Sequence, residues 1–390
     1  MTQAIQGDVV VPGNPVAKTK LFFKLYWHRG APGQPTPPWV LRFAYGMWLV
    51  AFTFKVLGSS WDVSWHFKFI RDDFAPPHLI NTVGTGIVIV LVMIHTYTGL
   101  GCDRRSLRLM QWGLGLFLIA APLDVINHRI NGLDLTSWSP THLLLYFGTA
   151  VMLAGVIDGW VKLAEPGRLR TLVLTGLWAF FLENMFFPNE QQEYGILGLR
   201  AWERGAPEAE PSLLSFAAQQ IGHPVDRAAV LHFTMPIPDW VYPLWGIGMS
   251  ALVLLVVRRT VGQKWSATVV AGAYVAYRAL IWPLLVVSTF PASAIPFYLV
   301  FVGFAVDLGA RFGRTTPGRA ALTGLLVTGL GYGALWLQAH LRPWLLGDAH
   351  TESAPPAAYW TALVVLLAVP ALWWVGRRRV NGKEGHRLGA

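Results

Sequence analysis

The sequence predicts an all-α fold, a polytopic integral membrane helical bundle of about ten transmembrane helices. Of its 390 residues, 54% are hydrophobic and only 13% are charged, whereas a water-soluble domain usually carries about 25% charged residues. The apolar residues also gather into runs of about 20, the length of helix that crosses the hydrocarbon core of a bilayer. These observations exclude an ordinary soluble domain.

Ten apolar runs define the expected helices, and an even number of spans places both termini on one side. In chain order the spans are residues 39–58, 79–100, 109–127, 141–161, 171–187, 239–257, 265–288, 292–310, 320–340 and 358–376. Arg278 falls inside the seventh span, where a charge is expected to pair with a carboxylate or to line a polar cavity.

The spans divide the chain into five expected regions. They are a basic N-terminal tail (1–38), a four-helix metal-binding repeat region (39–170), helices with a long outer loop at 188–238 (171–258), a C-terminal helical region (259–376) and a basic tail (377–390). The first region lacks the apolar core and cleavage site of a signal peptide, so we expect a tail. The outer loop is large enough for a small cap but not for an independent core.

Basic residues set the expected orientation. Of the 31 Lys and Arg residues, 21 lie in the two tails and in the loops at 101–108, 162–170, 258–264 and 311–319. Because basic residues resist translocation, both termini are predicted to be cytoplasmic in a multi-pass cell (inner) membrane. The formal charge of +10 then faces anionic lipid headgroups rather than nucleic acid. A single cysteine, Cys102, excludes a disulfide framework.

The hairpin between the first two spans carries the most informative motif. Its polar residues come in a fixed order, an acidic residue and a histidine four apart, an acidic turn, and a histidine after two prolines. These residues are Asp62, His66, Arg71, Asp72, Asp73 and His78. Trp61 and Trp65 flank the motif, where they could exclude water or carry electrons.

The hairpin between the third and fourth spans repeats this order. Asp124 and His128 are again four residues apart, Asp134 supplies the acidic turn, and His142 follows a proline at the start of the next apolar run. Trp138 flanks this second set. The shared order indicates an internal repeat.

The spacing of these residues is suited to metal ligation. Residues four apart share one helix face, and a proline that ends the helix lets the chain return with the third ligand. Two imidazoles and one carboxylate suit copper, zinc or non-haem iron, and polar groups at a bilayer edge are functional candidates. Two alternatives remain, helix-end polar pairs and bis-histidine haem ligation by His66/His78 and His128/His142.

At these residues the chain resembles the C subunit of the copper membrane monooxygenases, which include particulate methane monooxygenase and ammonia monooxygenase. The resemblance covers about residues 59–150. It implies copper ligation by Asp62, His66 and His78, with one residue fewer between the histidines than in the family. The second hairpin is similar to the family's other intramembrane site, although Asp124 stands where the family has asparagine.

The resemblance implies a copper-dependent membrane monooxygenase or one of its subunits. Its substrates would be O2 and a small reduced or apolar molecule such as ammonia, methane or a short hydrocarbon. Partners would be the lipid bilayer, other monooxygenase subunits and further copies of the chain, since nothing resembles the copper-binding B subunit. The alternatives are a lipid-linked glycosyltransferase that uses Asp72 and Asp73, and a membrane metal transporter or assembly factor. The metal sites are expected toward the outer face.

Overall fold

The computed structural model describes residues 25–69, 74–131, 136–234, 241–291, 295–312 and 316–346. Helices dominate these residues, which contain no β-strand. Several sequence predictions lie outside the described residues and are not placed by the structure. They are Arg71, Asp72, Asp73 and Asp134, residues 1–24 of the expected N-terminal tail, the tenth span at 358–376 and the basic tail at 377–390.

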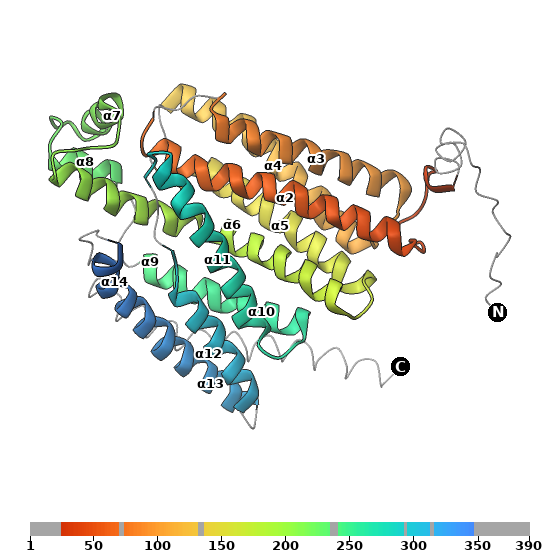
Figure 1. The fold of residues 1–390 in the computed structure, drawn as a ribbon. Coiled ribbons are helices and arrows are strands. Elements are labelled where there is room, and N and C mark those ends of the chain that lie inside the picture. Colours follow the sequence, from red (N-terminus) through yellow and green to blue (C-terminus); the bar gives the residue numbers. More distant parts are fainter. Residues whose placement is uncertain are drawn as a thin grey trace, which may run out of the picture.

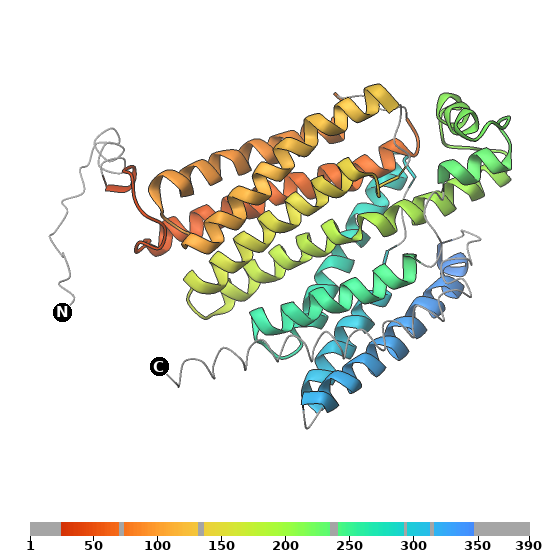
Figure 2. The ribbon, with the colours of Figure 1, turned by 180° about the vertical axis from the view of Figure 1, so that it is seen from behind.

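The helices follow one another in an up-and-down arrangement, with short connections between the first five (Figure 1). Their bounds are α2 Pro38–His66, α3 Pro76–Thr98, α4 Arg104–Asn131, α5 Pro140–Leu163, α6 Arg168–Glu203, α7 Pro211–Ile221, α8 Arg227–Thr234, α9 Val241–Pro243, α10 Ser250–Val261, α11 Ser266–Val287, α12 Tyr298–Phe312, α13 Thr316–Leu326 and α14 Tyr332–Leu346. Two π-helical segments interrupt the later helices, η1 Leu244–Met249 and η2 Val327–Gly331. In both views α2–α5 form one group, and α10 and α12–α14 lie on the other side of α6 (Figure 2).

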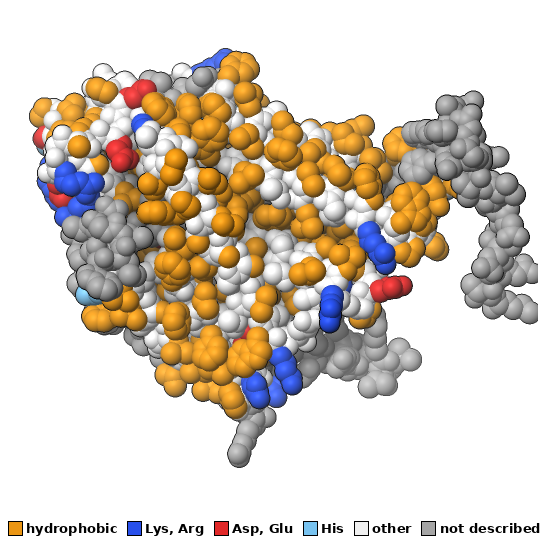
Figure 3. Space-filling view, viewed as in Figure 1, with side chains coloured by type: hydrophobic (Ala, Val, Ile, Leu, Met, Phe, Trp, Pro, Cys, Tyr) orange, Lys and Arg blue, Asp and Glu red, His pale blue; other side chains and the backbone are white. Residues whose placement is uncertain are grey.

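Within the described residues, eight helical segments are long and apolar enough to cross a membrane, which makes the chain a candidate multi-pass membrane protein. Hydrophobic side chains cover most of one face, and charged side chains gather at its margins (Figure 3). The expected span at 292–310 corresponds to α12, which has only 15 residues and therefore a length of about 22 Å. A full crossing needs about 20 residues, so α12 is too short to count among the eight.

The stretch 188–238, expected as one long outer loop, is largely helical. α6 continues past Pro188 to Glu203, and α7 and α8 follow. A proline removes one backbone hydrogen bond but does not end a helix whose flanks are held by packing, and the residues after Pro188 are mostly buried. α7 and α8 pack on the end of α6 through Leu213, Leu214 and Phe233, forming a small helical cap.

Small residues bring the helices of each early hairpin into close contact. A Cβ at Gly84 of α3 would lie 2.7 Å from the carbonyl oxygen of Ala51 in α2, and one at Gly155 of α5 would lie 2.8 Å from the backbone nitrogen of Met110 in α4. Such distances exclude any larger side chain, as at other close helix contacts in membranes. Both hairpins are therefore tightly packed internally.

A buried ion network joins α6, α11 and α2. Arg278 of α11 contacts Glu183 at 3.1 Å and Glu190 at 3.0 Å, both in α6, and all three side chains are at most 4% exposed. Ser60 of α2 donates to Glu183 and lies 2.8 Å from the hydroxyl of Tyr277. This arrangement confirms the expectation that Arg278 pairs with a carboxylate.

Replacing Arg278 is expected to destabilise the protein strongly. Arg278→Leu would leave the Glu183 and Glu190 carboxyls buried without a cation, which costs about 3–5 kcal/mol when one partner of a buried pair is removed. Denaturation in mixed micelles would measure the free energy of unfolding. Arg200→Leu is the control, because Arg200 forms a partly exposed pair with Glu203 worth at most about 1 kcal/mol. Equal stability of the two variants would contradict the structural role of the network.

Candidate metal centre

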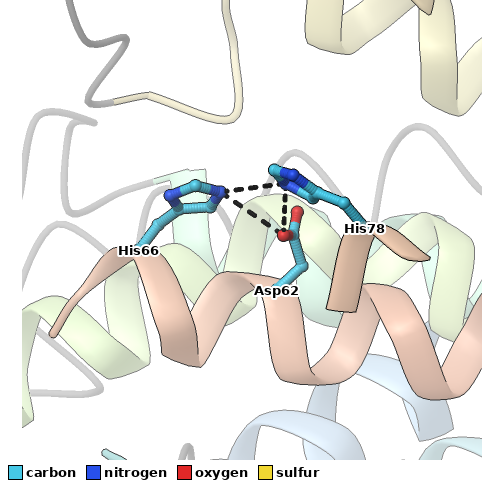
Figure 4. Close-up of side chains that lie close together, drawn as sticks. All are labelled: Asp62, His66 and His78. Atoms are coloured by element: carbon cyan, nitrogen blue, oxygen red, sulfur yellow. Dashed lines mark hydrogen bonds and ion pairs between the residues drawn. The ribbon is translucent and has the colours of Figure 1, made fainter. Parts of the chain in front are cut away.

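The first set of predicted ligands forms a compact triad at the junction of α2 and α3 (Figure 4). Asp62 and His66 lie one turn apart at the end of α2, and His78 lies in the first turn of α3, directly after Pro76 and Pro77. The Asp62 Oδ1 atom lies 3.3 Å from His66 Nε2 and 2.8 Å from His78 Nε2. The two Nε2 atoms are 3.4 Å apart.

These separations match the edges of a coordination polyhedron around one ion. Ligand atoms about 2.1 Å from a metal lie about 3.0 Å apart at a right angle and about 3.4 Å apart at the tetrahedral angle. The three distances in the first triad, 2.8 Å, 3.3 Å and 3.4 Å, fall close to this range. Asp62, His66 and His78 therefore fit a single divalent ion with coordination positions left open.

The second set forms a triad of the same residue types at the junction of α4 and α5. Asp124 and His128 lie in α4, and His142 is in the first turn of α5. Asp124 Oδ2 lies 3.6 Å from His128 Nδ1, and Asp124 Oδ1 lies 3.4 Å from His142 Nε2. All three candidate ligand atoms are within 4.8 Å of one another. Asp124 is buried, whereas the side chain of Asp62 is 30% exposed.

Backbone and hydroxyl groups orient the ligands of the second triad. The Nδ1 atom of His142 lies 2.9 Å from the carbonyl oxygen of Thr136, and a carbonyl can only accept, so Nδ1 carries the proton and Nε2 keeps its lone pair. Thr141 donates from Oγ1 to Asp124 Oδ1 at 2.8 Å. Partners of this kind fix the tautomer and direction of metal ligands.

Both triads open into one cavity of about 410 Å³ that lies between the two early hairpins. Its walls come from α2–α6 and from Phe233 of the helical cap; most of the wall surface is apolar, and α3 contributes the polar side chains Asn81, Thr82 and Thr85. Phe233 packs against Phe67, with ring centroids 5.5 Å apart. The cavity volume is in the range of sites for small organic molecules.

Polar side chains outside the two sequence motifs also face this cavity. Asn184 donates to the carbonyl oxygen of Tyr146, and Gln191 accepts from the hydroxyl of Ser137 at 2.6 Å. Lys55, in the middle of α2, lines the cavity as well. A charged residue within an apolar span was the signal that could have identified Lys55 in the sequence.

The three flanking tryptophans contact aromatic neighbours and are not among the residues that line the cavity. Trp61 and Trp65 both pack on Phe290, with ring centroids 5.6 Å away in each case. Trp138 packs against Trp245 at 5.1 Å. They therefore border the hairpin ends without reaching the triads' shared space.

The triad geometry does not fit bis-histidine haem ligation. Axial ligands approach a haem iron from opposite faces of the macrocycle. His66 and His78 instead converge on one oxygen of Asp62, which would lie where the porphyrin must pass. In the second triad the Asp124 carboxylate also lies between the two histidines, with His128 near Oδ2 and His142 near Oδ1.

Comparisons of the chain with protein-family models, with curated proteins and with solved structures found no match. The glycosyltransferase alternative rests on Asp72 and Asp73, which lie outside the described residues. The geometry of the two triads is accordingly the main structural guide to function.

Removing the hydroxyl that contacts Asp124 is expected to weaken metal binding at the second triad. Thr141→Val deletes the hydrogen bond to the Asp124 carboxylate, and loss of such a partner lowers metal affinity by about 10–100-fold. Titration with Cu(II), followed by electron paramagnetic resonance, would measure the affinity. Thr82→Val is the control, because Thr82 lines the same cavity but donates only to the carbonyl of His78. Equal affinities in both variants would contradict the role assigned to Thr141.

Proposed function

We propose that the protein is a membrane-embedded, copper-dependent monooxygenase, or a subunit of one, that acts on a small reduced or apolar substrate with O2. The observation that carries the proposal is the pair of Asp/His/His triads on one largely apolar cavity. The resemblance of residues 59–150 to the copper membrane monooxygenases favours copper over zinc or iron. The overall reaction would insert one oxygen atom and form water, with two electrons and two protons from an external reductant.

The residues of the chain would contribute binding, orientation and exclusion of water. A copper ion bound at a triad would supply the redox chemistry that activates O2. Asp62 and Asp124 would each offset part of the charge of an ion, and Pro76–Pro77 and Pro140 place the third ligands. The aromatic walls, together with Phe67 and Phe233, would keep bulk water from the ligands and hold an apolar substrate.

The same proposal includes the orientation and partners of the chain. The α2–α3 and α4–α5 junctions lie at one end of the bundle, as does the helical cap (Figure 1). The distribution of basic residues would place this end at the outer face and both termini in the cytoplasm. The bilayer, further monooxygenase subunits and other copies of the chain are the partners that such an enzyme would have.

Copper analysis of single-histidine variants tests the proposal. We expect two copper ions per purified chain, one fewer in His66→Ala, one fewer in His128→Ala, and none in the double variant, because each triad would lose one of its three ligands. His232→Ala is the control, since His232 is an exposed residue that contacts Gln220 away from both triads.

Unchanged copper content in both His66→Ala and His128→Ala would exclude the triads as copper sites. Oxygenation would be checked with isotopically labelled O2, whose label should enter the product. Copper flux across proteoliposomes without such labelling would instead assign the same ligands to metal transport.

A further inference from the structure

Lys55 places a basic group inside the membrane-spanning part of the cavity wall. It lies in the middle of α2, and only 5% of its surface is exposed to solvent. Charged side chains at this depth are rare and face a partner or a functional cavity. Lys55 faces the cavity that both triads share.

The surroundings of Lys55 supply hydrogen-bond acceptors and an aromatic ring but no counter-charge. The Nζ atom donates to Asn81 Oδ1 at 3.0 Å and to Thr85 Oγ1 at 3.2 Å, and it lies 3.7 Å from the centre of the Phe117 ring. Two neutral acceptors and an aromatic face stabilise an ammonium ion. Among the described residues Lys55 forms no ion pair, although an unpaired charge in an apolar interior is strongly unfavourable. An anionic ligand would supply the missing charge.

The position of Lys55 relative to the triads indicates the shape of such a ligand. Lys55 precedes Asp62 by seven residues, so the two lie on one face of α2, about 10 Å apart along the helix axis. Between these two points α2 lines the cavity with Val56 and Ser59, and α4 lines it with Phe117, Leu118 and Ala121, so most of these side chains are apolar. A ligand that satisfies Lys55 and reaches a triad is therefore a chain with one anionic end.

From this arrangement we infer that the cavity binds a single-chain anionic amphiphile, a medium-chain fatty carboxylate, with its carboxylate on Lys55, Asn81 and Thr85 and its hydrocarbon chain directed toward the two triads. As a ligand site this assignment stands by itself. As the substrate class for oxygenation near the far end of the chain, it rests on the proposed function.

Equilibrium binding of radiolabelled laurate to the metal-free protein in nanodiscs tests the assignment. We expect saturable binding by the wild type and a loss of affinity of about tenfold or more in Lys55→Met, the change that one charge-assisted hydrogen bond produces. Dodecanol, which has the same chain but no charge, should bind both proteins alike, and this also shows that the variant is folded. Lys68→Met is the control, because Lys68 contacts Thr289 and does not line the cavity.

Crosslinking gives the position of the bound chain. A fatty carboxylate with a diazirine at its terminal carbon should label cavity residues beside the triads, such as Val63 or Val125. Labelling confined to lipid-facing residues, or equal laurate affinity in wild type and Lys55→Met, would overturn the inference. Because the protein is metal-free, these results are independent of copper binding. Laurate binding without copper sites would refute only the proposed function, and copper sites without laurate binding would refute only the ligand assigned here.

Discussion

The salt bridges of Arg278 with Glu183 and Glu190 hold α6 against α11 deep within the bundle. The direction in which the first triad's ligands point depends on this contact. Through Ser60 the same network reaches α2. Ser60 and Asp62 lie on different faces of that helix, with Asp62 but not Ser60 lining the cavity. Fixing Ser60 on the α6–α11 side therefore turns Asp62 and His66 toward the space between the hairpins. The bilayer core contains no water that could solvate a charged group moved out of this network, so the rotation of α2 about its axis is strongly determined.

Tight packing within each hairpin and loose packing between them produce the shared space. Close contacts at Gly84 and Gly155 draw the two helices of each hairpin together, whereas Phe117 of α4 and Phe180 and Phe187 of α6 line the cavity between the hairpins. The triads stand at the hairpin ends, where prolines start the returning helices. Rigid helices rather than loops thus hold all six candidate ligands, which suits a site that must keep its geometry.

The sequence was sufficient for features that depend on local spacing. From the four-residue separation of Asp62 and His66 and the prolines before His78, we predicted that these three side chains would lie together, and in the structure they do. Binding of a metal ion by them stays a prediction. Features set by long-range packing were not predictable. Pro188 is a local signal for the end of a helix, yet α6 continues because both of its flanks are buried. Whether Lys55 faces lipid, protein or a cavity depends on the rotation of α2, which distant residues fix.

The two hairpins differ at one corresponding position on the cavity wall, which holds Lys55 in the first hairpin and Phe117 in the second. Lys55 lies seven residues before Asp62, and Phe117 lies seven residues before Asp124, so corresponding positions hold a cation in one hairpin and a ring in the other. Two matched halves would offer a bound molecule two interchangeable poses. This difference gives the cavity one cationic end, so a molecule with a single anionic group is held in one orientation, with its apolar part toward both triads.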